Sequence, residues 1–285
     1  MSTHSNKAIL IVCFGTAHTA ARLRTLDAIE ADIRTAFPDY PVYTAWTGSQ
    51  LIARLKKEDG ILVDTVSESL YRMKSDGITD VIIQPAFTIP GMEYAVLWTE
   101  ASACAKLFAS IRIEKPLLSD ETALPAVATA IISEFPDLSS NEALIFMGHG
   151  TASHGTAAQT APALTLSKND CTVIHPVTPN HIYIALEQTF RQSGLVNVFV
   201  GAMNGEPSLG TIIPRLDSLN PRKVILAPLM ITAGSHAVRD LSGDSPDSWK
   251  SRLMRAGFSV ECVMKGLGEY EAVRRLFVRN TALNI

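Results

Sequence analysis

Eight short apolar runs, most of them rich in β-branched residues, recur along this chain of 285 residues and alternate with longer segments of helical periodicity. The runs are AILIVCF (8–14), YPVYTAW (40–46), DVIIQPAF (80–87), IRIEK (111–115), ALIFMG (143–148), NVFVGAM (197–203), KVILAPLM (223–230) and FSVECVM (258–264). The helical segments include LRTLDAIEADIRTAF (23–37), ASACAKLFASI (101–111), HIYIALEQTFRQSG (181–194) and SWKSRLMRAG (248–257). Strands that are apolar along their whole length are buried on both faces, as in parallel sheets covered by helices. The alternation therefore predicts an α/β fold with doubly wound parallel sheets.

The two halves of the sequence resemble each other. Three segments match in the same order: ILIVCFGTAHT (9–19) with LIFMGHGTASH (144–154), VYTAWTGSQLIARL (42–55) with VFVGAMNGEPSLGTIIPRL (198–216), and VIIQPAFTIPGMEYAV (81–96) with VILAPLMITAGSHAV (224–238). This alignment places Phe14 opposite His149 and Glu93 opposite His236. It predicts an internal duplication, with similar α/β lobes at residues 1–137 and 138–285.

Histidines follow two strands of the second half. His149 stands between two glycines after ALIFM, and His236 follows the strand KVILAPLM. Open α/β sheets bind ligands at the carboxyl ends of their strands, so we expect these histidines in a cleft formed by the two lobes. Imidazole is a good ligand for first-row divalent ions, and a nearby carboxylate would neutralise charge. His149 and His236 are therefore candidate metal ligands.

Each candidate also has a simpler interpretation. A histidine at a strand end is often a hydrogen-bonded turn residue, and Glu93 would favour a helix N-terminus whatever its function. Arg22, Arg24 and Arg239 could bind carboxylates in the cleft or be solvated surface charges. His154 and His181 could support the site or lie on the surface, and the remaining histidines are expected to be solvated.

Several function classes lose support. The net charge of −3 and the absence of a Lys/Arg run argue against nucleic-acid or membrane-surface partners. No apolar run reaches the roughly 18–20 residues of a membrane span, and the start MSTHSNKAILIVCFG lacks the charged region of a secretory signal. The four scattered cysteines suit reduced thiols. We therefore expect a cytoplasmic protein; a leader removed before residue 1 and the oligomeric state stay open.

Motifs of the common nucleotide-dependent and hydrolytic enzymes are missing. The chain has no GxGxxG, Walker A, HExxH or GxSxG sequence, so we expect no nucleotide cofactor. One segment, about 152–180, has no counterpart in the first half. Loops of this length are usually functional or disordered, and this one is expected to be a lid or an oligomer contact.

Four segments carry a resemblance to a known family: FGTAHT, FMGHGTASH, PLMITAGSHAVRDLSGDSPDSWKSRL and GLGEYEAVRRLFV. Together they resemble the anaerobic sirohydrochlorin cobaltochelatases, class II tetrapyrrole chelatases related in fold to ferrochelatase. The resemblance covers nearly the whole chain, and its most specific part is GSHAVRDLSGDSPDSWK. It implies a lyase of anaerobic cobalamin biosynthesis that inserts Co(II), without ATP, into sirohydrochlorin or precorrin-2. Fe(II) or Ni(II) are possible alternative metals.

The resemblance also implies roles for single residues. His149 and His236 match the family's metal-holding histidines, and Glu93 matches a glutamate of a GDEY-like turn, so these three are expected to be catalytic. Arg22, Arg24 and the Gly15-Thr16 turn are expected to bind the macrocycle and its carboxylates. A metal-binding glutamate of the family falls on Asn204 here, and Glu206, two residues on, is expected to replace it as the third metal ligand.

Two other functions compete with the chelatase. A bilobal carrier would bind a tetrapyrrole or a metal without joining them, and the Asn204 departure favours it. A metal-dependent hydrolase would need a richer carboxylate cluster than the sequence shows.

Overall fold

The computed structural model describes residues 6–151, 165–166 and 180–283, which form two compact units. The first unit comprises the described residues up to Leu117, a short strand at Thr165–Leu166 and the chain from Arg274 onward. The second comprises the other described residues from Leu118 to Val273. The predicted lobe boundary between residues 137 and 138 stays a prediction.

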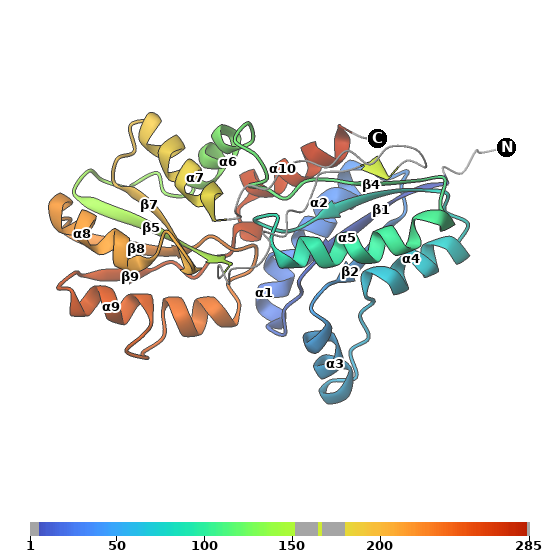
Figure 1. The fold of residues 1–285 in the computed structure, drawn as a ribbon, viewed down its shortest axis with the longest axis horizontal. Helices are drawn as coiled ribbons and strands as arrows, with labels where there is room; N and C mark the ends of the chain where they lie inside the picture. Colours follow the sequence, from blue (N-terminus) through green and yellow to red (C-terminus); the bar gives the residue numbers. More distant parts are fainter. Residues whose placement is uncertain (1–5, 152–164, 167–179, 284–285) are drawn as a thin grey trace. The chain divides into compact units, whose positions relative to one another are not determined.

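The first unit contains a five-stranded sheet in the order β2-β1-β3-β4-β6, of which Figure 1 labels β1, β2 and β4. Its strands are β1 (Lys7–Cys13), β2 (Val42–Trp46), β3 (Asp80–Pro85), β4 (Ser110–Ile113) and β6 (Thr165–Leu166). The first four are parallel, and β6 is antiparallel to β4. Its helices are α1 (Thr19–Arg24), α2 (Leu26–Ala36), α3 (Ser49–Glu58), α4 (Val66–Ser75), α5 (Met92–Cys104) and, from Arg274, α10 (Glu271–Ala282).

Both faces of this sheet are covered. Leu10 and Val12 of β1 share one apolar cluster with α4 and α5, represented by Leu70 and Leu97. Residues of alternate parity point to the opposite face, where the buried Gln84 of β3 accepts a hydrogen bond from Thr281 of α10 at 3.0 Å. Burial on both faces explains why the central strand β1 is apolar from Ala8 to Cys13.

The second unit contains a four-stranded parallel sheet in the order β7-β5-β8-β9. Its strands are β5 (Glu142–Gly150), β7 (Val198–Asn204), β8 (Lys223–Pro228) and β9 (Val260–Cys262). Its helices are α6 (Leu124–Ile132), α7 (His181–Gln192), α8 (Leu209–Leu219) and α9 (Trp249–Arg255), with a short π-helical turn, η2 (Ala237–Leu241), after β8.

The strand registers support the internal duplication. Ile9 of β1 pairs with Val42 and Ile82, while Leu144 of β5 pairs with Val198 and Ile225. These are the residues that the sequence alignment of the two halves places opposite each other. The prediction of two similar parallel α/β sheets is confirmed.

All eight predicted strands are present, with ends that shift by a few residues. The predicted helix 101–111 is wrong in its second half, because α5 ends at Cys104, a 3-10 turn follows at Ala105–Leu107 and β4 begins at Ser110. Parallel pairing of Ser110 with Asp80 overrides the helical pattern there. The predicted helix 23–37 is divided at Thr25, whose φ of −121° and ψ of −77° are not helical.

Other predictions about the chain concern its thiols and membrane spans. Cys13, Cys104 and Cys262 are free thiols, as predicted, whereas Cys171 lies outside the described residues. Within the described ranges, no helix has the length and apolar character needed to span a membrane. The predicted insertion at about 152–180 lies almost wholly outside the described residues.

Candidate functional site

His149 lies at the end of β5 between two glycines. These glycines allow the end of the strand to pack very close to α7 and β7. A Cβ on Gly148 would lie 2.5 Å from the Tyr183 ring, and one on Gly150 would lie 2.2 Å from the backbone oxygen of Asn204. Gly150 also has a φ of +67°, which disfavours other residues. The Tyr183 hydroxyl accepts a hydrogen bond from the Gly150 N–H at 3.3 Å. The GHG sequence is thus a packing requirement that places an exposed histidine on a rigid strand end.

Two asparagine side chains hold the adjoining backbone. Asn180 accepts a hydrogen bond from the Thr151 N–H at 2.9 Å and donates to the Asn204 carbonyl at 2.9 Å. Asn204 in turn donates from its side-chain amide to the His149 carbonyl at 3.2 Å. The ends of β5 and β7 are therefore joined around His149. Sequence reasoning missed Asn180, because the bonds it makes depend on strands that are far apart in the chain.

The structure brings His149 and His236 together within the second unit. Their ring centroids lie 4.8 Å apart with an interplanar angle of 77°. The His149 Nδ1 lies 2.9 Å from the Gly150 carbonyl oxygen, and the His236 Nδ1 lies 2.7 Å from Oδ2 of Asp240. Because a carbonyl oxygen and a carboxylate accept hydrogen bonds, each Nδ1 carries the proton, and Nε2 of a neutral ring keeps its lone pair. This is the arrangement of metal-ligating histidines in proteins.

Asp240 is shared between His236 and an arginine. Arg239 donates to both carboxylate oxygens of Asp240, from Nε and Nη2, each at 2.8 Å. The Arg239 guanidinium, and to a lesser degree the His236 ring, hold the pKa of the Asp240 carboxyl below its usual range. Asp240 is therefore ionised near neutral pH. Sequence reasoning missed Asp240, although its spacing of four residues from His236 is a signal that could have found it.

The predicted glutamates lie in different surroundings. Glu93 is in the first turn of α5 in the first unit, where Oε2 accepts a hydrogen bond from the Thr47 hydroxyl at 2.6 Å. Glu206 precedes α8 in the second unit, and its Oε2 accepts from the Ser208 N–H at 2.7 Å and the Thr211 hydroxyl at 3.4 Å. The described residues contain no group of three or more His, Cys, Asp or Glu side chains that could hold a metal ion. The structure thus brings together two of the three predicted metal ligands.

Three of the predicted macrocycle-binding residues follow β1 in the first unit. Gly15 has a φ of +96°, and a Cβ there would lie 2.2 Å from the Trp46 ring. The buried Thr16 accepts a hydrogen bond from the His18 N–H at 3.2 Å, which fixes the turn before α1. Arg24 is exposed at the end of α1.

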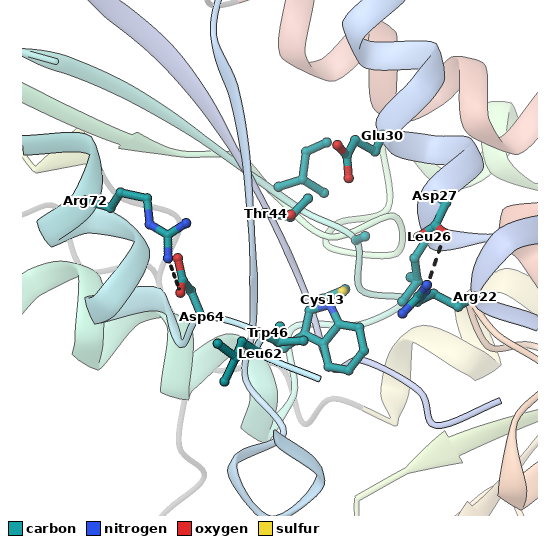
Figure 2. Close-up of a pocket in the computed structure, with 13 residues that line it drawn as sticks. Cys13, Arg22, Leu26, Asp27, Glu30, Thr44, Trp46, Leu62, Asp64 and Arg72 are labelled. Atoms are coloured by element: carbon teal, nitrogen blue, oxygen red, sulfur yellow. Dashed lines mark hydrogen bonds and ion pairs between the residues drawn. The ribbon is translucent and has the colours of Figure 1, made fainter. Parts of the chain in front are cut away.

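Arg22 lines a cavity of about 410 Å³ in the first unit. Figure 2 shows an ion pair on either side of this cavity, Arg22 with Asp27 at 3.4 Å and Arg72 with Asp64 at 2.7 Å. The Arg22 Nε is buried, and it is this atom that lies 3.4 Å from Oδ2 of Asp27. The remaining lining residues are mostly apolar or acidic: Ile11, Cys13, Leu26, Glu30, Thr44, Trp46, Leu62, Val63 and Ala86. Burial raises the pKa of the Cys13 thiol to about 12, so Cys13 is not a thiolate at neutral pH.

Two further histidines lie in the described part of the chain. His18 precedes α1 in the first unit, and His181 is the exposed first residue of α7. His4, His154 and His175 lie outside the described residues.

Comparison with known proteins gives a consistent family relationship. A family model described as "Cobalt chelatase (CbiK)" matches residues 7–178 and 174–284. The chain is 32% identical over 281 residues to a sirohydrochlorin cobaltochelatase of Salmonella typhimurium, covering 98% of this chain and 97% of that one. It is 30% identical over 274 residues to the sirohydrochlorin cobaltochelatase CbiKC of Nitratidesulfovibrio vulgaris, covering 94% and 86% of the two chains.

A solved structure supports the fold alone. SirB from Bacillus subtilis with Fe3+ superposes with a TM-score of 0.59 at 11% sequence identity, covering 97% of this chain and 94% of that one. At this identity the likeness supports the fold but does not support a role for any single residue at the site.

Proposed function

The chain belongs to the cobalt chelatase (CbiK) family, and on that premise we propose that it inserts Co(II) into sirohydrochlorin in anaerobic cobalamin biosynthesis. In this role it is a lyase, a metal chelatase that needs no ATP and acts in the cytoplasm. The observation in this chain that carries the proposal is the pair of imidazoles whose ring centroids lie 4.8 Å apart. Each ring has its Nδ1 within hydrogen-bond distance of an oxygen. Fe(II) and Ni(II) are the alternative metals, since imidazole suits both.

His149 and His236 hold the metal through their Nε2 atoms. In the reaction the macrocycle exchanges two pyrrole N–H protons for the divalent ion, so two protons must leave as the Co–N bonds form. We assign Glu93 as an acceptor for these protons, and the hydrogen bond from Thr47 fixes its orientation. The assignment rests on the family match of GMEY and on the first-turn position of Glu93 in α5.

Glu206 is our candidate for a third protein ligand. Ser208 and Thr211 donate hydrogen bonds to Oε2 of Glu206, so we assign metal binding to the other carboxylate oxygen, Oε1. The aligned position, Asn204, uses its amide to hold the His149 carbonyl. Asn204 thus supports a metal ligand instead of acting as one.

Arg22 and Arg24 are assigned to the peripheral carboxylates of sirohydrochlorin, together with the Gly15-Thr16 turn. The cavity beside Arg22 supports this assignment because Trp46 and Leu26 provide apolar surface and Arg22 lines the same cavity. A guanidinium is well suited to a carboxylate, since it can donate two parallel hydrogen bonds.

A carrier of a tetrapyrrole or metal is the second candidate function. Two observations favour it. The described residues bring together two histidines but no third candidate ligand, and Asn204 stands at the position where the family has a metal-binding glutamate. Turnover separates the two functions, because a carrier binds macrocycle and metal without accelerating their union.

An absorbance time course of sirohydrochlorin with Co(II) tests the proposal. The wild type is compared with His149→Ala and with His181→Ala, a matched control at an exposed histidine of the same unit. We expect the wild type and the control to accelerate formation of the cobalt complex and His149→Ala to fall to the uncatalysed rate. A wild type that binds sirohydrochlorin but stays at the uncatalysed rate would establish the carrier instead.

A further inference from the structure

The two histidines differ in what their Nδ1 atoms face. His149 faces the neutral carbonyl oxygen of Gly150, whereas His236 faces the ionised carboxylate of Asp240. A carboxylate on the far nitrogen pushes electron density into the ring and makes the ligating nitrogen more basic. His236 is therefore built to be the stronger metal ligand of the two.

Arg239 acts on the same carboxylate. Its guanidinium occupies both oxygens of Asp240 in a two-bonded arrangement, and its Nη2 also lies 3.4 Å from the His236 Nδ1. Each hydrogen bond from a cation withdraws charge from the carboxylate, so less density reaches the imidazole. Asp240 and Arg239 thus have opposite effects on the His236 Nε2.

The backbone holds these three residues in place. They lie at the start of and within the π-helical turn η2, a rare geometry that is frequent at functional sites. The buried Ala237 and Leu241 anchor the turn, and the Ser242 hydroxyl donates to the Ala237 carbonyl at 3.1 Å. A Cβ on Gly243 would lie 2.4 Å from the Arg239 carbonyl oxygen, so the exit from the turn is tightly packed.

We propose that Asp240 and Arg239 are positioning residues that set how tightly His236 holds the metal. Asp240 fixes the ring and strengthens its Nε2 as a ligand, and Arg239 limits that strengthening so that the ion can pass to the macrocycle. The inference rests on the proposed function, but the quantity that it predicts is the affinity of the protein for Co(II), which can be measured without a macrocycle.

Equilibrium binding of Co(II) alone, followed by the visible absorbance of the bound ion or by calorimetry, tests the pair. For Asp240→Asn we expect Co(II) binding to weaken by about 10- to 100-fold. The amide nitrogen can turn toward Nδ1 and favour the tautomer in which Nε2 carries the proton. For Arg239→Gln we expect binding to tighten by about threefold or more, because the carboxylate regains its full effect on the ring.

Insertion kinetics with sirohydrochlorin supply the second readout. Arg239→Gln is expected to lower both the KM for Co(II) and kcat, since a metal held more tightly is transferred more slowly. Arg239→Lys keeps the charge without the fork and should lie between Gln and wild type in Co(II) affinity. Arg222→Gln, an exposed arginine beside β8 in the same unit, is the control for loss of one positive charge and should match the wild type.

If the two substitutions change the Co(II) affinity in opposite directions, this role is distinguished from a purely structural one. If Arg239→Gln and Asp240→Asn both weaken Co(II) binding, the pair only stabilises η2 and the inference is wrong. If the wild type binds no Co(II), the inference also fails. If the binding shifts have the expected opposite signs while the protein shows no turnover, the inference stands and the proposed chelatase activity fails.

Discussion

The two sheets of this protein share one strand arrangement but end in different side chains. At the end of β1 the first unit presents Phe14, which is 48% exposed, where the second presents His149 at the end of β5. After the third strand the first unit has Glu93 in the first turn of a 13-residue α-helix, where the second has His236 before a five-residue π-turn. The duplicated scaffold is shared, and the two histidines that we propose as metal ligands belong to the second copy.

The glycines show which features both copies need. Gly15 and Gly150 occupy equivalent positions, and both have positive φ, +96° and +67°. In each copy a Cβ would come within 2.2 Å of the neighbouring strand, at Trp46 in the first and Asn204 in the second. A close approach of two strand ends is therefore a property of the scaffold, whereas the residue before the glycine is free to differ.

The charged residues at the amino ends of the strands also differ between the two copies. Lys7 pairs with Asp80 in the first unit, and Glu142 pairs with Lys223 in the second, so the charges at one ladder position are exchanged. Opposite charges across the ladder stabilise the pairing whichever strand carries which charge.

The strongest test of the comparison replaces the two equivalent strand-end residues. We expect His149→Ala to weaken Co(II) binding by about 100-fold or more, because it removes one of two imidazole ligands, and Phe14→Ala to leave it within about twofold of wild type. Calorimetric titration with Co(II) checks both. Equal losses in the two variants would contradict the assignment of the His149 imidazole as a metal ligand.

A second test concerns the position before each strand-end residue, which is Gly148 in one copy and Cys13 in the other. Gly148→Ala would push a methyl group into the Tyr183 ring, and overpacking of this kind costs about 1–3 kcal/mol. We expect Tm to fall by about 3–10 °C in thermal unfolding followed by circular dichroism. Cys13→Ala, which only removes a buried sulfur, is the matched variant and should cost about 1 kcal/mol. A Gly148→Ala protein with unchanged Tm would show that Tyr183 can move away freely.

A third test asks whether Glu206 has a metal-binding role that no residue of the first unit shares. We expect Glu206→Gln to weaken Co(II) binding by about tenfold, the effect of losing one charged ligand that is partly replaced by water. Thr211→Val removes a hydroxyl that hydrogen-bonds Glu206 and the Ser208 carbonyl but leaves both Glu206 oxygens in place, so it is expected to leave the affinity unchanged. If both variants lose affinity equally, Glu206 acts by fixing the start of α8.

The smallest expected effect is a change in acid stability in the first unit. The Ser110 hydroxyl, then the Thr79 hydroxyl and the Lys7 charge, lower the pKa of the Asp80 carboxyl below its ordinary value of 3.8. A depressed folded-state pKa stabilises the protein above the unfolded pKa, and this stabilisation is lost as pH falls through the folded pKa. Ser110→Ala should therefore lower Tm by about 1–2 °C at pH 7 and by less at pH 3.

Thermal scans of wild type and Ser110→Ala from pH 7 to pH 3 measure this difference. Lys223→Met breaks the ion pairs that Lys223 makes with Glu142 and Glu261 at the corresponding edge of the second unit. It should show the same trend, because the pKa of Glu142 is also lowered, mainly by Lys223. A Ser110→Ala deficit that grows toward low pH would contradict the assignment.

Much of the scaffold was predictable because its determinants are local. Eight of the strands coincide with apolar runs of the sequence, and three pairs of matched segments in the same order indicate the duplication. The same alignment paired His149 with Phe14 and identified His149 and His236 as candidates. The helix predicted at 101–111 failed in its second half because its apolar residues fit a strand as well, and pairing with β3 decided between them.

The sequence by itself thus determined the α/β class, the internal duplication and the two candidate histidines that follow strands of the second half. The tertiary structure alone decided that Asn204 holds the His149 carbonyl and that Asn180 joins Thr151 to Asn204. Backbone periodicity follows from neighbouring residues, and so it can be read along the chain. The partner of a polar side chain depends on which distant segments pack beside it and on the rotamer that packing permits, which no local pattern specifies.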